Sequence, residues 1–350
     1  MKTKAAILTK TNAPLEIDEV ETPRLKRGQL LVKILYSGVC RAQWNEIIAL
    51  KGPDRFLPHL LGHEATGIIE ELGPGVTKVK PGDYVILSWI KGKGLDGVNS
   101  QYRRGSELVN AGGVTTFSGH SVVSENRVTK ISRKMPADIA CIIGCAVATG
   151  CGIVYHTFKA KKGDSIAVFG VGGVGSSALL AAKSRKCYPI IAVDVSSYKL
   201  RHAKNLGASH VVNAKGKDAI KKIFAICRQG IKFAIDASGT KPAMEMAFAS
   251  LEEKGTLVIA GNLPKDQKIE LHPFELIKGK KILGSWGGET VPDRDYPRYV
   301  RAYLKGELAL DQLITHRFKL DEINEAFHLL INGQAGRIIL KNSNGANHAD

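Results

Sequence analysis

The side chains in this sequence best suited to hold a metal ion are Cys40, His63 and one of three later cysteines. His63 stands in "LLGHEATG", where glycines on both sides of the His-Glu pair let the backbone fold tightly. The later cysteines are Cys141, Cys145 and Cys151 in "ACIIGCAVATGCG". Catalytic zinc takes three such ligands and leaves its fourth position to substrate or water. Taken alone, each residue is more typical of a structural role, because a buried cysteine usually packs as a small apolar group.

A glycine-rich turn, "GVGGVG" from Gly170 to Gly175, follows the apolar run "DSIAVF" and precedes a helical pattern. In this context the turn predicts a dinucleotide site, where glycines admit a pyrophosphate to the N-terminus of a helix. The next apolar strand ends in Asp194, 19 residues after Gly175. A carboxylate there accepts both hydroxyls of an adenosine ribose and repels a 2′-phosphate, which favours NAD over NADP.

Two kinds of element must position these residues. The first third of the chain holds short β-like runs such as "QLLVKILYSG" and "DYVILSW" between Gly/Pro turns, which predicts a compact, strongly bent β domain. After about residue 160, apolar strands alternate with helical patterns, which predicts a parallel, doubly wound α/β sheet. With 350 residues, two domains are expected.

Composition bounds the remaining possibilities. Hydrophobic residues make up 44% and charged residues 24%, as in soluble globular proteins. The N-terminus lacks the long apolar segment of a secretory signal, so a cytoplasmic location is expected and the six cysteines are expected to be thiols. The net charge is +17, but the basic residues are spread along the sequence without a nucleic-acid-binding motif, so no nucleic-acid or membrane partner is expected.

Five ordered motifs carry a family resemblance: "GVC" near 40, "GHEATG" near 63, "VKPGDYV" near 80, "IIGCAVATG" near 145 and "GVGGVG" near 170. In this order they resemble the zinc-dependent alcohol dehydrogenases of the medium-chain dehydrogenase/reductase superfamily, over nearly the whole chain. The resemblance implies a bent β-rich, GroES-like catalytic domain (1–147), a Rossmann domain (148–285) and a return to the catalytic domain (286–350). It also implies a homodimer or homotetramer that joins its nucleotide-binding sheets edge to edge.

The same resemblance assigns roles to single residues. The catalytic zinc ligands would be Cys40, His63 and Cys145, with Glu64 as a nearby carboxylate that can approach the metal. Cys141 and Cys151 would be core residues. The cofactor contacts would be Arg41, Thr149, Gly170, Gly172, Gly173, Val174, Gly175, Asp194, Lys199 and Arg337, and the substrate pocket would include Ala42, Asn45, Trp89 and Phe117.

The sequence departs from the family at two places. Trp89 to Phe117 contains none of the cysteines that hold a second, structural zinc in many relatives, so one zinc ion per chain is expected. The hydroxyl and histidine that usually relay the alcohol proton are replaced by Ala42 and Asn45, and the usual acidic residue is Gln43. The proton would then leave through water, Glu64 or a group on the substrate.

These departures favour a substrate that brings its own hydroxyls. We therefore expect hydride transfer between NAD(H) and a polyol, sugar or sugar phosphate, and Lys91, Lys93, Arg103 and Arg104 suggest an anionic substrate. Simple primary or secondary alcohols, and threonine- or sorbitol-type substrates, are the alternatives within this reaction class. A metal-free quinone-reductase-like enzyme or a non-catalytic relative remains the alternative outside it.

Overall fold

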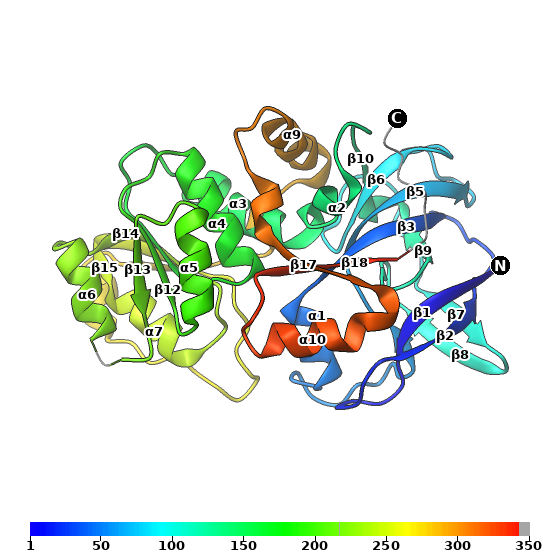
Figure 1. Cartoon of the computed structure of the whole chain (residues 1–350), viewed down its shortest axis with the longest axis horizontal. Helices are drawn as coiled ribbons and strands as arrows, with labels where there is room; N and C mark the ends of the chain where they lie inside the picture. Colours follow the sequence, from blue (N-terminus) through cyan, green and yellow to red (C-terminus); the bar gives the residue numbers. More distant parts are fainter. Residues whose placement is uncertain (217, 343–350) are drawn as a thin grey trace.

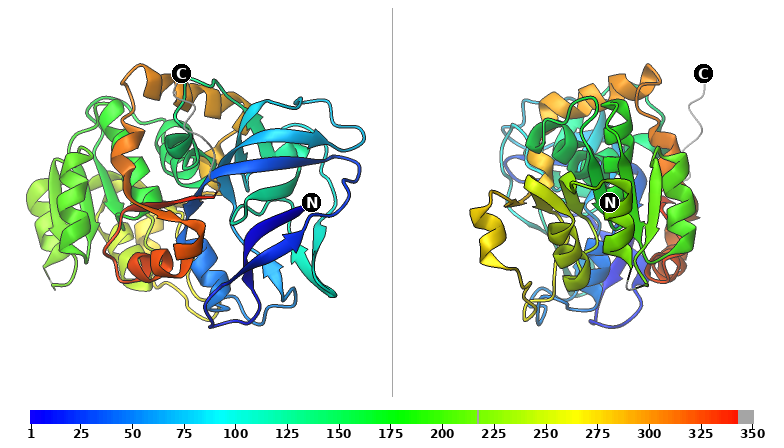
Figure 2. Two further views of the ribbon diagram at one scale, coloured as in Figure 1. Left: turned by 45° about the vertical axis from the view of Figure 1, so that its right-hand side comes forward. Right: turned by 90° about the vertical axis from the view of Figure 1, so that its left-hand side faces the viewer.

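The computed structural model describes residues 1–216 and 218–342 and shows two regions side by side (Figure 1). The N-terminal third and the last strands form the β-rich region, and the middle of the chain forms the α/β region at the opposite end. Figure 2 shows the last strand, in red, running back from the α/β region into the β-rich region.

The β-rich region contains a closed barrel with the strand order β1-β2-β7-β8-β4. Alternate residues of β1, such as Ala5 and Ile7, point into its core with Tyr102 and Val109, as the period of a strand requires. Closure leaves this sheet without a free edge. Its strands are β1 (Lys2–Leu8), β2 (Glu16–Glu21), β4 (His59–Leu60), β7 (Ser100–Arg104) and β8 (Glu107–Ala111).

A second sheet of this region has the order β10-β6-β5-β3-β18-β17, and β9 also pairs with β3. The C-terminal strand β18 pairs antiparallel with β3, with Ile338 opposite Val39. The end of the chain is therefore built into the region that holds Cys40. The strands are β3 (Gln29–Val39), β5 (Glu64–Leu72), β6 (Tyr84–Ser88), β9 (His120–Ser124), β10 (Val128–Lys130), β17 (Ile314–Lys319) and β18 (Arg337–Lys341).

The α/β region is a parallel sheet in the order β13-β12-β11-β14-β15-β16 among the described residues. Successive side chains of β11 point to opposite faces of the sheet. Ile166 and Val168 pack with α4 on one face, and Ala167 and Phe169 pack with α6 and α7 on the other. Helices therefore cover both faces, which confirms the doubly wound α/β fold predicted from the alternation.

The strands of this sheet are β11 (Ile166–Phe169), β12 (Ile190–Asp194), β13 (His210–Asn213), β14 (Ile231–Asp236), β15 (Leu251–Ile259) and β16 (Lys281–Gly284). The helices that cover it are α4 (Gly173–Ser184), α5 (Ser197–Asn205), α6 (Ala219–Ile226) and α7 (Lys241–Ala249). The short helix α8 (Pro273–Ile277) precedes β16 and has no buried residue.

One helical stretch, Ala137–Thr157, lies between the two regions. By length and composition it could cross a membrane, but 89% of its most apolar window is buried inside the protein, as in a core helix. It consists of α2 (Ala137–Ala140), the π-helical turn η2 (Ile143–Val147), α3 (Ala148–Gly152) and the π-helical turn η3 (Ile153–Thr157). Such π-turns often occur at functional sites, and η2 contains Cys145.

In chain order, the other helices are α1 (Arg41–Ile47), η1 (Glu125–Arg127), η4 (Gly287–Glu289), α9 (Pro292–Leu304), η5 (Leu310–Leu313), η6 (Leu320–Glu322) and α10 (Ile323–Ile331). The first of them, α1, follows Cys40 directly and packs against α10.

Candidate metal centre and cofactor site

Four side chains from three separate segments converge at one point. Cys40 follows β3, His63 directly precedes β5, Glu64 begins β5, and Cys145 lies in η2. One ligand atom from each lies within 4.8 Å of the other three, and His63 Nε2 lies 3.2 Å from Cys145 Sγ. Two thiols, an imidazole and a carboxylate are the donor types that zinc prefers, so these residues fit the metal.

The structure distinguishes Cys145 from the two neighbouring cysteines in the sequence, Cys141 and Cys151. Cys145 joins the cluster, whereas the thiol of Cys141 donates to the carbonyl of Asp138 at 3.1 Å and that of Cys151 to the carbonyl of Ser177 at 3.5 Å. Burial raises the pKa of both Cys141 and Cys151, which keeps them as neutral thiols. Their surroundings are those of core residues.

The pKa values of Cys40 and Cys145 are shifted in opposite directions. A hydrogen bond from the Cys145 thiol, assisted by His63 and Arg337, holds the pKa of Cys40 well below its ordinary value. The same hydrogen bond, together with burial, raises the pKa of Cys145. The cluster thus already favours one thiolate, the form in which cysteine binds a metal.

Arg337, the first residue of β18, links this cluster to the glycine-rich turn. Its guanidinium forms an ion pair with Glu64, donates to the carbonyl of Val39 at 3.0 Å, and is buried. A Cβ built on Gly173 would lie 3.1 Å from Arg337 Nη1, so the side chain reaches the start of α4. A Cβ on Gly38 would lie 2.7 Å from both Arg337 Nη2 and Glu64 Cδ, so only glycine fits beside this pair.

The glycine-rich turn has the geometry that the sequence predicts. Gly170 has φ +92°, in the region that favours glycine, and a Cβ on Gly175 would lie 2.0 Å from the carbonyl oxygen of Gly170. A Cβ on Gly172 would meet no atom within 4 Å, so the backbone there is open to an approaching group. The turn leads directly into α4, whose N-terminal N–H groups suit a pyrophosphate.

Asp194 stands at the end of β12, beside this turn. One carboxylate oxygen accepts the backbone N–H of Val171 at 2.7 Å and the other accepts that of Ser196 at 2.8 Å. These bonds aim the carboxylate, and each oxygen retains a second lone pair for a ribose hydroxyl. Lys199 lies on the first turn of α5, where its backbone N–H donates to Ser196 Oγ at 3.4 Å.

Thr149 and Val174 lie where the helix bearing Cys145 packs against α4. Thr149 is buried, and its hydroxyl donates to the carbonyl of Cys145 at 2.9 Å. Between them, a Cβ on Gly150 would lie 2.2 Å from the carbonyl oxygen of Val174, so the helices touch backbone to backbone. Arg41, by contrast, begins α1 with an exposed side chain.

Two family profiles match this chain: "Alcohol dehydrogenase GroES-like domain" over residues 26–133 and "Zinc-binding dehydrogenase" over residues 173–305. The S-(hydroxymethyl)glutathione dehydrogenase of Escherichia coli O1:K1 is 33% identical over 97% of this chain and all of that protein. The chain belongs to the zinc-dependent alcohol dehydrogenase family. It is thus an oxidoreductase of the alcohol dehydrogenase type, in a family that uses Zn²⁺ and NAD(H).

Solved structures agree with this family. Benzyl alcohol dehydrogenase from Acinetobacter calcoaceticus superimposes with a TM-score of 0.88 at 29% identity, covering 98% of this chain and 100% of that one. An alcohol dehydrogenase zinc-binding domain protein from Burkholderia ambifaria gives 0.90 at 26% identity, covering 98% and 99%. Both confirm the GroES-like and Rossmann regions of the expected fold.

The side chains beside His63 come from the helix α1. The buried amide of Gln43 accepts the backbone N–H of Gly62 through Oε1, and its Nε2 lies 3.0 Å from His63 Nδ1. Ala42 and Asn45 lie half-buried on the same helix, α1, and neither can titrate. A neutral amide therefore orients the histidine of this alcohol dehydrogenase.

The sequence interpretation overlooked a carboxylate on this helix, Glu46. The Gln43 amide donates to Glu46 Oε1 at 3.4 Å. Loss of solvation raises the pKa of Glu46, although the nearby His63, His59 and Lys51 oppose the shift. The one-turn spacing of Gln43 and Glu46 on a helix is the pattern that could have revealed the contact.

Carboxylates accept backbone hydrogen bonds from the segment Trp89 to Phe117, which lacks the structural-zinc cysteines. Buried Glu125 accepts the backbone N–H groups of Thr77, Lys78 and Leu95, each at 2.7 Å. Burial acts to raise the pKa of Glu125, but these three hydrogen bonds prevail and lower it. A further carboxylate, Asp293, accepts the N–H of Lys93 at 2.7 Å.

The four cations of this segment differ in their surroundings. Lys91 pairs with Asp96 at 2.5 Å, and Arg104 pairs with Glu16 at 2.7 Å and also with Glu107. Lys93 and Arg103 are exposed and form no ion pair with a described residue. Half of the predicted anion-binding group is thus already neutralised within the protein.

The two aromatic pocket candidates also lie in different settings. Trp89 packs edge-to-face on Trp286, with 5.1 Å between ring centroids, and the Trp286 side chain is 81% exposed. Phe117 is only 1% exposed and packs on Phe327 in the core. Of the two, only Trp89 lies beside an exposed aromatic surface.

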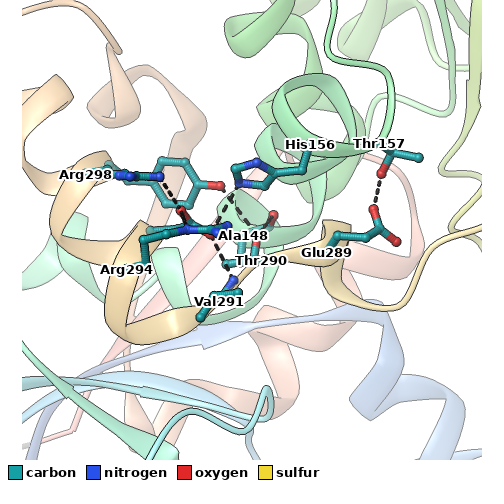
Figure 3. A network of polar contacts seen from close by, with 10 residues as sticks. Ala148, His156, Thr157, Glu289, Thr290, Val291, Arg294 and Arg298 are labelled. Atoms are coloured by element: carbon teal, nitrogen blue, oxygen red, sulfur yellow. Dashed lines mark hydrogen bonds and ion pairs between the residues drawn. The ribbon is translucent and has the colours of Figure 1, made fainter.

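The end of the helix bearing Cys145 is braced from outside by the network in Figure 3. Buried Asp295 on α9 lies 3.3 Å from His156 Nε2 and accepts hydrogen bonds from Arg294 and Arg298. Thr290 donates to the carbonyl of Ala148 at 2.8 Å. These contacts tie α9 and the preceding loop to the helix that carries the metal ligand.

Proposed function

We propose that this alcohol dehydrogenase transfers hydride between NAD(H) and a hydroxyl of a polyol, sugar or sugar phosphate. The observation that carries the reaction is the convergence of Cys40, His63 and Cys145 on one point, linked through Arg337 to the glycine-rich turn. The observation that supports a polyhydroxylated substrate is the replacement of the usual proton relay by Ala42 and Asn45.

When bound, zinc supplies a Lewis acid that stabilises an alkoxide, and the nicotinamide supplies the hydride acceptor. Cys40, His63 and Cys145 would hold the metal, with Gln43 fixing the histidine ring. Asp194 would bind the adenosine ribose and exclude a 2′-phosphate. Thr149 and Val174 would border the nicotinamide, and Arg41 and Arg337 the pyrophosphate. Glu64, paired with Arg337, would remain the nearest carboxylate to the metal.

A single zinc ion per chain is part of the proposal. Glu125 links Leu95, in the segment that lacks the four cysteines, to Thr77 and Lys78 outside it, so this segment is anchored without a metal. Metal analysis of the purified protein should return about one zinc per chain, and two would contradict this assignment.

Simple alcohols form a second candidate class. The exposed Trp89–Trp286 pair favours a flat substrate, and a structural relative with 29% identity is named a benzyl alcohol dehydrogenase. Lys93 and Arg103 remain the cations free to attract an anionic polyol instead. The two classes differ in charge and in hydroxyl number, so one panel of substrates separates them.

The deciding experiment is NAD reduction by the zinc-loaded enzyme with sugars, sugar phosphates, polyols, and short and aromatic alcohols. A polyol or sugar with the highest kcat/KM would support the proposal, while preference for benzyl or short alcohols would select the second class. Activity that survives complete removal of zinc by a chelator would contradict the metal assignment.

The exposed edge of the α/β sheet supports a homo-oligomer. Its edge strand β16 and the preceding residues expose apolar side chains, among them Ile277 at 77% and Leu283 at 43%. Pairing of two such edges would cover them, as expected for a dimer or a tetramer built from dimers. A cytoplasmic location remains a further part of the proposal.

A further inference from the structure

The positive charge of this chain is concentrated in one segment. Residues 183–232 contain 12 of the 50 lysines and arginines but only 2 of the 33 acidic residues. This one-seventh of the chain therefore carries +10 of the net +17. The basic residues that look dispersed along the sequence are thus strongly clustered once acidic residues are counted beside them.

This segment belongs to the α/β region, and its elements β13 and α6 lie toward the end of the molecule away from the β-rich region (Figure 1). It forms β12, α5, β13 and α6, and β13 is an edge strand of the parallel sheet. The opposite edge, β16, is the apolar one. The basic edge would therefore remain accessible in an oligomer that pairs through β16.

A hollow of about 480 Å³ lies at this basic edge, between α5 and α6 and over β13. Three cations border it: Arg201 and Lys204 from α5 and Lys222 from α6. Ser197 and Asn213 add a hydroxyl and an amide that can donate hydrogen bonds. The remaining lining residues are Leu200, Val211 and Val212, so no acidic residue of the described chain lines the hollow.

The three cations lack internal partners. Arg201, Lys204 and Lys222 form no ion pair within the described ranges 1–216 and 218–342. The two acidic residues of the segment are engaged elsewhere, since Asp194 accepts backbone N–H groups beside the glycine-rich turn and Asp218 lies 3.9 Å from Lys221. Three like charges around one hollow repel one another, so an anion placed among them relieves that repulsion.

From this geometry we infer that the hollow is a second ligand site, for a small molecule carrying two or more linked phosphate groups. Arg201 presents a planar fork that suits phosphate oxygens, and the two lysines add point charges from a neighbouring turn and from the facing helix. The volume lies within the range of small-molecule sites. None of the residues proposed to contact NAD lines it, so both ligands can bind together.

The site is tested by calorimetric titration of the zinc-loaded enzyme, saturated with NADH so that the dinucleotide site is filled. Inorganic tripolyphosphate and pyrophosphate are the probes. We expect one molecule bound per chain, at least about tenfold more tightly than orthophosphate, with an affinity that falls as salt rises. Equal binding of all three anions would overturn the inference, as would binding of single-stranded oligonucleotide without any binding of tripolyphosphate.

A charge-matched pair of variants locates the site. R201Q/K204Q/K222Q removes the three bordering cations, and R24Q/K161Q/K162Q removes three exposed cations elsewhere. The first variant should weaken tripolyphosphate binding at least about tenfold and the second less than about twofold, with unchanged alcohol oxidation in both. An equal loss of tripolyphosphate affinity in both variants would show that binding depends only on net charge, and would overturn the assignment of the site. Thermal melting of each variant verifies that it is folded.

Discussion

The guanidinium of Arg337 and the carboxylate of Glu64 form a buried ion pair, although 273 positions separate them in the sequence. Arg337 begins the last strand and Glu64 begins β5, and Gly38 on the strand between them leaves the space that the pair occupies. This pair stands between the metal ligands and the start of α4. Its removal should affect stability and both binding sites.

Replacing Arg337 by methionine should destabilise the protein by about 3–5 kcal/mol, because Glu64 would then be a buried charge without its partner. Urea unfolding of the zinc-loaded enzyme measures the loss. The double variant R337M/E64Q, which removes both charges, should recover part of it. A single variant as stable as the wild type would show that the ion pair contributes nothing to the fold.

Replacing Cys145 by serine should lower the zinc content well below one per chain and reduce activity by more than about 100-fold, since even residues that only orient a ligand contribute 10–100-fold. Metal analysis and steady-state kinetics provide the measurements. The matched control is Cys151→Ser, which changes another buried thiol on the same helix and should retain zinc. Retention of full zinc by the Cys145 variant would refute the ligand assignment.

Replacing Asp194 by alanine should raise the KM for NAD about 10–100-fold, the range expected for losing hydrogen bonds to a charged group. The KM for NADP should fall, because the repulsion of its 2′-phosphate is removed. The kcat should change little with saturating NAD, since the proposed contact of Asp194 is with the adenosine ribose and not with the nicotinamide. A mutant that keeps the wild-type preference for NAD would contradict the assigned role.

Replacing Gln43 by alanine should weaken zinc binding about 10–100-fold, because the ring of His63 would lose its orienting partner. Competition with a chromogenic chelator measures the affinity without relying on activity. Gln43→Glu places a carboxylate oxygen where the Gln43 Nε2 faces His63 Nδ1, and this oxygen can accept the Nδ1–H of a histidine bound to zinc through Nε2, so this variant should bind zinc at least as tightly as the wild type. If alanine and glutamate at this position bind zinc equally, Gln43 does not orient the ligand.

Glu125 should make stability depend on pH. Its folded-state pKa is lowered, so its contribution is complete above the ordinary glutamate value of about 4.3 and is lost as the pH falls toward the folded-state pKa. Melting temperatures of wild type and Glu125→Gln, measured from pH 7 down to pH 3, test this. The difference between the two proteins should narrow as the pH falls. A difference that stays constant would mean that the Glu125 charge is not the source.

Much of the site could be predicted from the sequence because each part has a local pattern. Gly170 to Gly175 lies between a strand and a helix, and Asp194 ends the next strand, so the dinucleotide turn needs no knowledge of distant contacts. The choice of Cys145 over Cys141 and Cys151 depended on the resemblance, since spacing alone left all three open. In the fold only Cys145 joins His63, and the other two thiols donate to backbone carbonyls.

Other features depend on tertiary contacts that local patterns do not encode. Glu125 follows a strand like any surface carboxylate, yet it binds three N–H groups from two separate loops. The apolar helix Ala137–Thr157 holds three glycines and other small residues, and it is stabilised by burial rather than by propensity. The basic edge emerged only when β13 was placed beside α5 and α6.

The helix from Ala137 to Thr157 carries Cys145 and Thr149 one turn apart, and both ends of that turn are packed backbone to backbone. Because the backbone of this turn is packed at both ends, Cys145 cannot shift without a shift of Thr149. With the nicotinamide at Thr149 and the metal at Cys145, as proposed, a shift of one ligand would reach the other through a single turn of peptide.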